Sequence, residues 1–459
     1  MRKEKGKIKD TTSVGMDSDI SGCSNLGTSR LKDFEDVRLV ESYSLTLTLD
    51  NGVLERPKYE VFKSRAFRVL KNGFWGFCYG DFEVEEGLRL ARENIVYEGD
   101  SEVVETRFSG SFELKPKIRH EDVSLEEKVE FLREVEKRLK DEKVVSTRIV
   151  YMENVRRVEY SDSCGSELSY VVPRTGIVIQ AVAKENGVMQ FCSRRILKPA
   201  GYECINPALD LAEEVVRILK DLLKARLPPA GEMNVVMDPI LAGVFVHEAF
   251  GHAAEADHVL QKASVLEGRL GEKIAGDNVT ICDDPALPEF GYYPFDDEGV
   301  RAEKRVLVDR GVLVDYLHSR ETAARLGARP GNGRAQAALE PVVRMSNTYM
   351  EAGDYSLEEL LEEAKNGVFL LGTRGGETNP ATGYFQFSAQ YGYLIENGEI
   401  GEPVRDVALS GNTLEILRDI KLGKEVEFDP GFCGKAGQLV PVSDGAPNSL
   451  VRARVGGHG

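Results

Sequence analysis

The stretch VHEAFGHAAEADH, residues 246–258, places two histidines and a glutamate close together. Zinc peptidases commonly use His-Glu-x-x-His, whose histidines stand four apart on one face of a helix. Here His247 and His252 stand five apart, and Glu248 follows the first directly. The chain has only six histidines, so this clustering indicates a metal site that uses imidazole ligands rather than histidines packed by chance in a core.

The spacing creates a geometric difficulty, because five residues of a regular α-helix turn the second side chain about 140° from the first. A π-bulge widens a single turn and brings such residues back to nearly the same side. Gly251, just before His252, tolerates a distorted backbone. The sequence therefore predicts a deformed turn between Glu248 and His252. Glu248 would then face an open coordination position, where it can take a proton from water.

A catalytic zinc site uses three protein ligands, and three residues are candidates for the third. His258 lies six residues after His252, the interval found in metzincins, but it lacks the glycine that turns the chain there. Glu255 could bind the ion or hold an imidazole in place. Cys433, in the turn DPGFCGKAGQ, could present a thiolate or be an inert buried cysteine. These residues alone leave the choice open.

Composition excludes several classes of function. The chain has 459 residues, 42% hydrophobic and 29% charged, which is enough for two or three domains. A net charge of -17 argues against a nucleic-acid partner and against an anionic membrane surface. No apolar run is long enough to span a bilayer, and the N-terminus lacks an apolar signal region, so we expect a cytoplasmic protein. Seven cysteines without a CxxC pair fit reduced thiols.

The pattern along the chain predicts an α+β fold in three parts. Residues 1–30 lack hydrophobic periodicity and read as a mobile N-terminal arm. Residues 31–230 predict an N-terminal α/β domain with a mixed or antiparallel sheet. Residues 231–459 predict a C-terminal catalytic domain rich in antiparallel β-structure, which carries the distorted metal-binding helix. We place the boundary at PPAGE, 228–232, because proline ends the amphipathic helix expected over 206–227.

Local signals locate the elements of both domains. Asn51-Gly52 and Asn72-Gly73 predict two hairpin turns. We expect helices over 84–95 and 124–141, the second opened by a capping box, and an antiparallel sheet over 144–194. In the second domain we expect a strand at MNVVMD, a helix over 356–366, and hairpins at RVLVDRGVLVDYL and YGYLIENGEIGEPV.

Several motifs in order resemble the TldD/PmbA family of metallopeptidases. They are HEAFGHAAEAD, GNGR at 331–334, RMSNTYM at 344–350, YLIENGEI at 393–400, and CGKAGQLVPVSDGAPNSLVRARVGG at 433–457. The resemblance covers nearly all of 232–457 and extends more weakly over 40–225. Because PmbA-type members lack the His-Glu-x-x-x-His element, the chain resembles the TldD-type, catalytic subunit.

The resemblance implies one Zn²⁺ per chain, held by His247, His252 and Cys433, with Glu248 as the catalytic base. It implies that His258 is a bystander and that Glu255 supports an imidazole. The family also shares the DDEG part of YYPFDDEG, in which three acidic residues could line the cleft or cap a turn: Asp296, Asp297 and Glu298.

By the same resemblance, the protein would hydrolyse small or unfolded polypeptides in an enclosed cavity, together with a PmbA-type partner subunit or as a homodimer. Extended peptides often bind by adding a strand to a sheet edge. The glycine-rich segment 372–392 could provide that edge or form an exposed hairpin. Two alternatives are a zinc amidase acting on small substrates and a non-catalytic metal-binding subunit. Glu248 argues against the second, because a structural site needs no base and normally closes with four ligands.

Overall fold

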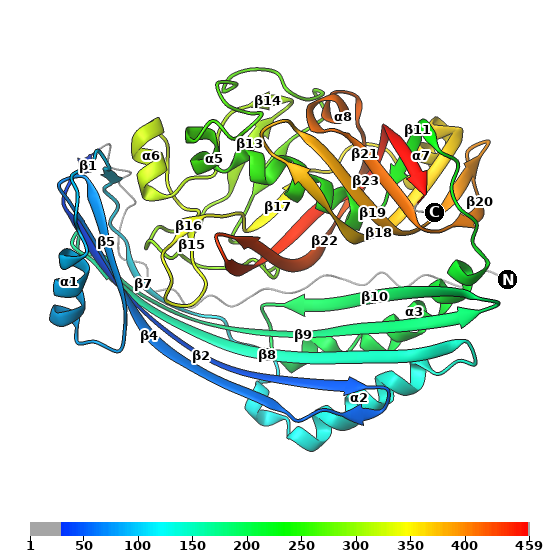
Figure 1. The fold of residues 1–459 in the computed structure, drawn as a ribbon, viewed down its shortest axis with the longest axis horizontal. Helices are drawn as coiled ribbons and strands as arrows, with labels where there is room; N and C mark the ends of the chain where they lie inside the picture. Colours follow the sequence, from blue (N-terminus) through cyan, green and yellow to red (C-terminus); the bar gives the residue numbers. More distant parts are fainter. Residues whose placement is uncertain (1–28, 458–459) are drawn as a thin grey trace.

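Two large β-sheets, one from each half of the chain, lie one above the other in the computed structural model (Figure 1). The structure describes residues 29–457, so the predicted arm at 1–30 lies outside the described residues except for its last two. Within this described part, no helix is both long and apolar enough to cross a membrane.

The first sheet is built from unusually long strands. Its central strands have 17 to 19 residues each, and nearly all neighbours are antiparallel. Asn51-Gly52 and Asn72-Gly73 form tight turns with positive φ at every turn residue, as predicted. The main path runs β10 (Val188–Lys198), β9 (Glu167–Glu185), β8 (Val144–Asp162), β2 (Phe34–Asp50), β4 (Lys58–Lys71) and β5 (Phe74–Gly80).

Two helices cover the face of this sheet that points away from the second half: α2 (Leu125–Leu139) and α3 (Ala208–Lys224) (Figure 1). The predicted capping box opens α2, since Ser124 and Glu127 each accept a hydrogen bond from the other's backbone N–H. Leu132 of α2 and Leu219 of α3 are buried against the strands and help form the core of the first half. A shorter helix, α1 (Val84–Glu93), packs on β4 and β5.

The second sheet is larger and mixed. Its longest strand is the 20-residue β23 (Gln438–Gly457), which pairs with β22 (Lys421–Lys435) as a long hairpin. The predicted hairpins at Arg310-Gly311 and Asn397-Gly398 are present, and so is the helix near 356–366, as α7 (Leu357–Ala364). Other members are β11 (Gly231–Met237), β18 (Asn366–Asn379), β19 (Tyr384–Glu396), β20 (Glu399–Val404), β21 (Val407–Asn412), β17 (Asn347–Met350), β12 (Ile281–Asp283), β13 (Arg305–Asp309) and β14 (Val312–Leu313). The α+β fold class is therefore confirmed.

The segment carrying the two histidines is held inside the second half. It starts at α4 (Pro239–Val244), which packs on β23 and β18. Asp238 caps this helix by accepting a hydrogen bond from the N–H of Leu241 at 2.8 Å, and Pro239 occupies the first helical position. The apolar residues of the segment, such as Phe245 and Phe250, are fully buried in the larger core. This packing fixes the helix in front of the β22–β23 hairpin.

Candidate metal centre

The helix changes pitch where the sequence predicts it. After α4, residues Phe245–Gly251 form a π-helical turn, and His252–Ala254 continue as a 3₁₀ turn. The predicted deformed turn between Glu248 and His252 is thus confirmed. The reason for Gly251 differs from the prediction, because its backbone is ordinary right-handed helix with φ of −58°. A Cβ at Gly251 would lie 2.0 Å from Sδ of Met345, so close packing is what requires glycine here.

Three side chains converge in front of this turn. His247, His252 and Cys433 each offer a ligand atom, and these atoms all lie within 4.8 Å of one another. Sγ of Cys433, on β22, lies 3.6 Å from Nε2 of His252. The two imidazole rings stand nearly perpendicular, with centroids 5.3 Å apart. The wide turn therefore brings together two histidines that a regular helix would point apart.

A carboxylate stands behind each imidazole. Oδ1 of Asp444, on β23, lies 2.7 Å from Nδ1 of His247, although the two atoms are not aligned as a hydrogen bond. Oε2 of Glu255 lies 3.1 Å from Nδ1 of His252 and hydrogen-bonds to it. A carboxylate at Nδ1 leaves Nε2 free to bind a metal and makes the imidazole a better donor. Both rings are therefore arranged as metal-binding histidines usually are.

The electrostatics of the cluster suit a cation. Burial disfavours the Cys433 thiolate, but His247 and His252 outweigh it and lower its pKa to about 5. Burial also opposes charge on the histidines. Glu255 and Cys433 nevertheless raise the pKa of His252 to about 10, and Asp444 and Cys433 hold the pKa of His247 well above its usual value. Two imidazoles and a thiolate in one buried cluster form a donor set that fits Zn²⁺.

Glu248 lies beside the cluster at the edge of a cavity. Its side chain is 37% exposed, and its Oε2 lies 3.8 Å from Nε2 of His252. The cavity has a volume of about 390 Å³, and its lining includes His247, Glu248 and Asp444. Glu248 therefore faces space that a substrate can enter, whereas Glu255 is fully buried behind His252. Asp444 lies beside His247 and also borders the cavity.

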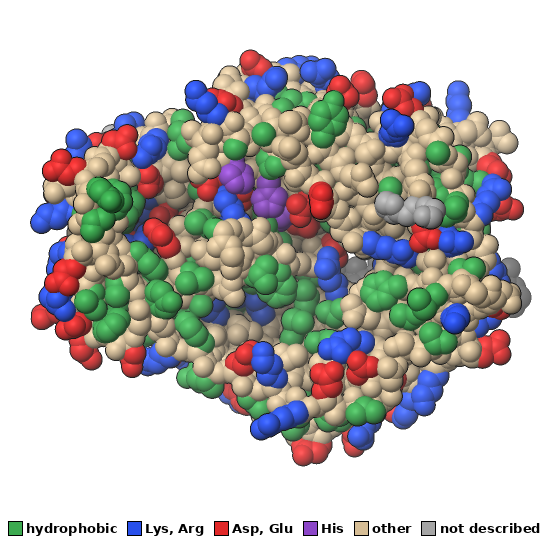
Figure 2. All heavy atoms as spheres, viewed as in Figure 1, with side chains coloured by type: hydrophobic (Ala, Val, Ile, Leu, Met, Phe, Trp, Pro, Cys, Tyr) green, Lys and Arg blue, Asp and Glu red, His purple; other side chains and the backbone are tan. Residues whose placement is uncertain are grey.

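Both halves of the molecule form the walls of this cavity. Arg194 and Arg195 of β10 contribute from the first sheet, and Asp429 and Phe432 of β22 contribute from the second. Arg195 forms an ion pair with Asp429 across the gap. Figure 2 shows histidine and acidic side chains gathered at the rim of a hollow between the two halves. Access to the candidate metal centre thus depends on how the halves are placed.

A free strand edge also borders the cavity. The predicted glycine-rich segment 372–392 forms a hairpin from the far part of β18 and the first part of β19, and residues 372–376 line the cavity. β11 pairs with β18 only up to Leu370, after which the chain leaves β11 for α4. Beyond that point the described part of the chain pairs β18 with β19 alone. The other edge of residues 373–379 is therefore not paired with another described strand, whereas the N–H of Gly372 already donates a hydrogen bond to Oδ2 of Asp238 at 2.9 Å.

The other candidates from the sequence lie outside the three-residue cluster. Nδ1 of His258 lies 3.0 Å from the carbonyl oxygen of His252 and 3.6 Å from Glu255, so its ring packs behind the site. His258, Glu255 and Asp257 could form a second cation site by geometry. The ammonium group of Lys435, however, lies between Glu255 and Asp257.

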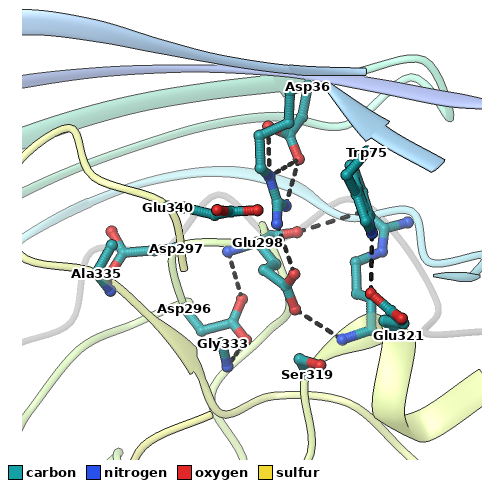
Figure 3. Close-up of polar contacts among 12 residues, drawn as sticks. Asp36, Trp75, Asp296, Asp297, Glu298, Ser319, Glu321, Gly333, Ala335 and Glu340 are labelled. Carbon is teal, nitrogen blue, oxygen red and sulfur yellow. Dashed lines mark hydrogen bonds and ion pairs between the residues drawn. The ribbon is translucent and has the colours of Figure 1, made fainter. Parts of the chain in front are cut away.

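The acidic residues of the DDEG segment are buried at the contact between the halves (Figure 3). They are not among the residues that line the cavity. Asp296 caps a turn, accepting hydrogen bonds from the N–H groups of Glu298 and Val300 at 3.0 and 2.9 Å. Asp297 and Glu298 form ion pairs of 2.8 Å with first-half arginines, namely Arg156 and Arg68 respectively. Asp296 therefore caps a turn, as one of the two interpretations expected. Asp297 and Glu298 instead connect the two halves of the molecule through ion pairs.

Sequence reasoning missed Asp444 and Arg195. Asp444 lies in the quoted motif VPVSDGAP, but nothing in its spacing points to His247, because the pairing of β22 with β23 brings it there. Arg195 lies in the other half of the chain, within a strand that reads as ordinary sheet. Only the packing of the two sheets shows that it borders the cavity.

Comparison with known proteins gives consistent results. Three family models match in order: PmbA/TldA metallopeptidase domain 1 over residues 36–95, the central domain over 118–227 and the C-terminal domain over 230–457. A metalloprotease of Archaeoglobus fulgidus is 59% identical, with 92% of this chain and 99% of that one covered. A zinc metalloprotease TldD homolog of Saccharolobus solfataricus is 33% identical, with 93% and 97% covered. The crystal structure of TldE from Thermococcus kodakarensis has the same fold, with a TM-score of 0.73 at 19% identity over 92% of this chain and 97% of that one.

Proposed function

Because the chain belongs to the PmbA/TldD family of metallopeptidases, we propose that it is a TldD-type catalytic subunit, a zinc-dependent peptidase that hydrolyses small or unfolded polypeptides. One observation carries the proposal. His247, His252 and Cys433 converge beside a cavity into which Glu248 is exposed. These residues would hold a zinc ion with three protein ligands, which is the number that a catalytic zinc site uses.

In this proposal His247, His252 and Cys433 hold one zinc ion, which supplies Lewis acidity to water and to the scissile carbonyl group. Glu248 takes a proton from the attacking water and later gives it to the leaving amine. Its partial exposure leaves the carboxylate free to move between these two positions. Asp444 and Glu255 orient the imidazoles, and the fully buried Glu255 does not meet the substrate.

The free edge of β18 suggests how the substrate binds. An extended peptide laid along residues 373–379 would form main-chain hydrogen bonds that do not depend on its sequence. The cavity of about 390 Å³ is too small for a folded domain, so only an extended segment can reach Glu248. Peptides N-methylated at alternate residues should therefore raise KM, because they lose the N–H groups that pair with the edge.

We further propose that the protein works in the cytoplasm with a partner of similar fold, either a PmbA-type subunit or a second copy of itself. The fold shared with TldE supports a partner of this kind. A partner placed over the hollow would enclose the cavity that both halves already border. We also retain the division of the chain at residue 230 into a first domain and a catalytic domain.

Zinc quantification combined with a peptide digest tests the proposal. The wild type should contain about one zinc per chain and cleave an unfolded protein such as casein. Glu248→Gln should keep zinc and lose cleavage, whereas Cys433→Ala should lose zinc. A zinc amidase would cleave N-acyl amino acids and spare peptides, and a non-catalytic subunit would bind zinc and cleave neither. Wild-type cleavage rates in Glu248→Gln would refute the assignment.

A further inference from the structure

One cation that belongs to the chain itself lies just behind the candidate metal centre. The ammonium group of Lys435 is 3.0 Å from Oε2 of Glu255, 2.7 Å from Oδ2 of Asp257 and 3.0 Å from the carbonyl oxygen of Val343. The side chain of Lys435 is only 12% exposed, and that of Glu255 is fully buried. A primary ammonium has three N–H donors, so these three acceptors satisfy it completely.

Lys435 is on the same strand as the cysteine. Cys433 and Lys435 stand two apart near the end of β22, so their side chains project to the same side of the strand. Sγ of Cys433 approaches Nε2 of His252. Lys435 approaches Glu255, whose carboxylate hydrogen-bonds to Nδ1 of the same ring. One strand therefore contacts both ends of the His252 imidazole, directly through sulfur at one end and through a carboxylate at the other.

The contact with Lys435 explains how the buried Glu255 carboxylate keeps its negative charge. Glu255 has no exposed surface, its Oε1 has no hydrogen-bond partner, and Asp257 lies in the same cluster. Two carboxylates in such a place repel each other unless a cation lies between them. The ammonium group of Lys435 lies between Glu255 and Asp257 and supplies this cation.

Resting on the proposed function, we propose that Lys435 is a positioning residue of the metal centre. It holds the Glu255 carboxylate against Nδ1 of His252 and so fixes the orientation of the ring whose Nε2 would bind a zinc ion. Lys435 touches neither the ion nor the substrate, and its effect passes through Glu255. Removing its charge should therefore weaken zinc binding by the amount that is typical for the hydrogen-bond partners of metal ligands, about 10-fold or more.

The test measures zinc affinity by competition with a chromophoric chelator on the full-length protein. Lys435→Met keeps the aliphatic stem and should raise the zinc dissociation constant at least about 10-fold, while Lys435→Arg should recover most of the loss. Lys424→Met is the matched control, because Lys424 is also on β22 but its ammonium contacts the exposed Glu359 at 3.4 Å. It should bind zinc as the wild type does.

Two further measurements separate positioning from general stability. In the Co²⁺ protein, the thiolate-to-cobalt absorption band should shift in Lys435→Met and stay unchanged in Lys424→Met. If Lys435 acts through Glu255, the double variant Glu255→Gln/Lys435→Met should bind zinc no more weakly than Glu255→Gln alone. Losses that multiply in the double variant would overturn the inference, and so would an unchanged affinity in Lys435→Met. If Lys435→Met does not fold, Asp257→Asn can be used instead, because it removes one of the carboxylates that hold the Lys435 ammonium beside Glu255. This variant should also weaken zinc binding.

Zinc content and the cobalt spectrum of the wild type distinguish a failure of the Lys435 proposal from a failure of the proposed function. A wild-type protein without zinc and without the thiolate-to-cobalt band would refute the metal centre itself. A wild type with both, together with a Lys435→Met variant that matches it, would refute the role of Lys435 alone.

Discussion

Replacing Asp444 with asparagine should change how zinc binding depends on pH, and the change can be worked out from the site. In the protein without metal, Asp444 and Cys433 hold the pKa of His247 well above its usual value, and the pKa of His252 is raised to about 10. The pKa of Cys433 is lowered to about 5. Near neutral pH, therefore, both imidazoles carry a proton and the sulfur does not.

Zinc must displace one proton from each histidine, so its affinity for the wild type should rise about 100-fold per pH unit in this range. Asp444→Asn removes the main group that raises the pKa of His247, and burial then favours the neutral ring. In this variant His247 no longer carries a proton that zinc must displace. The zinc affinity should therefore rise by only about 10-fold per pH unit.

The same substitution also weakens the bound state, because the imidazole loses its supporting carboxylate, by about 10- to 100-fold. This deficit should be fully visible above the raised pKa of His247 and should shrink about 10-fold for each pH unit below that pKa. The two affinity curves should then cross about one to two pH units below the pKa of His247. Chelator competition at a series of pH values measures both slopes.

Asp429→Asn serves as the control for this experiment. Asp429 is a buried carboxylate on the wall of the same cavity, but its partner is Arg195 rather than a histidine. It should keep the wild-type slope. Parallel curves for Asp444→Asn and the wild type would show that Asp444 does not govern the proton on His247.

Three simpler substitutions test other parts of the structure. Glu248→Gln should lower kcat for peptide cleavage by about 10²- to 10⁴-fold with little change in zinc content, and loss of the metal instead would assign Glu248 to the ligand set. Asp162→Ala should lower the free energy of unfolding by about 3–5 kcal/mol, because it removes the carboxylate that pairs with the fully buried Arg320 at 3.0 Å. Urea denaturation measures this loss, and a value below about 1 kcal/mol would contradict the prediction. Ser124→Ala should cost about 1 kcal/mol by removing the cap of α2, while far-UV circular dichroism should show little change.

Features set by local chemistry could be predicted from the sequence. Asn51-Gly52 forms the expected turn because few other residue pairs accept positive φ at both positions. The five-residue interval between His247 and His252 predicted a widened turn, because the geometry of a helix allows few other ways to aim both at one ion.

Features set by distant pairing could not be predicted. The register of β22 against β23 places Asp444 behind His247, and packing of the first sheet brings Arg195 to the cavity. The need for glycine at position 251 comes from Met345, which lies far along the chain and leaves no local signal. Such contacts depend on the whole fold, so residue spacing alone does not contain them.

The cavity takes one wall from β10 and the opposite wall from β18 and β22. A peptide lodged there would touch both parts of the protein and act as a temporary crosslink between them. The two equilibria are then thermodynamically linked. A bound peptide stabilises the contact between the two halves, and a change that destabilises this contact lowers the affinity for the peptide by the same coupling free energy. Substitutions far from the histidines, at Arg68 or Arg156 for example, could thus tune how long a substrate stays.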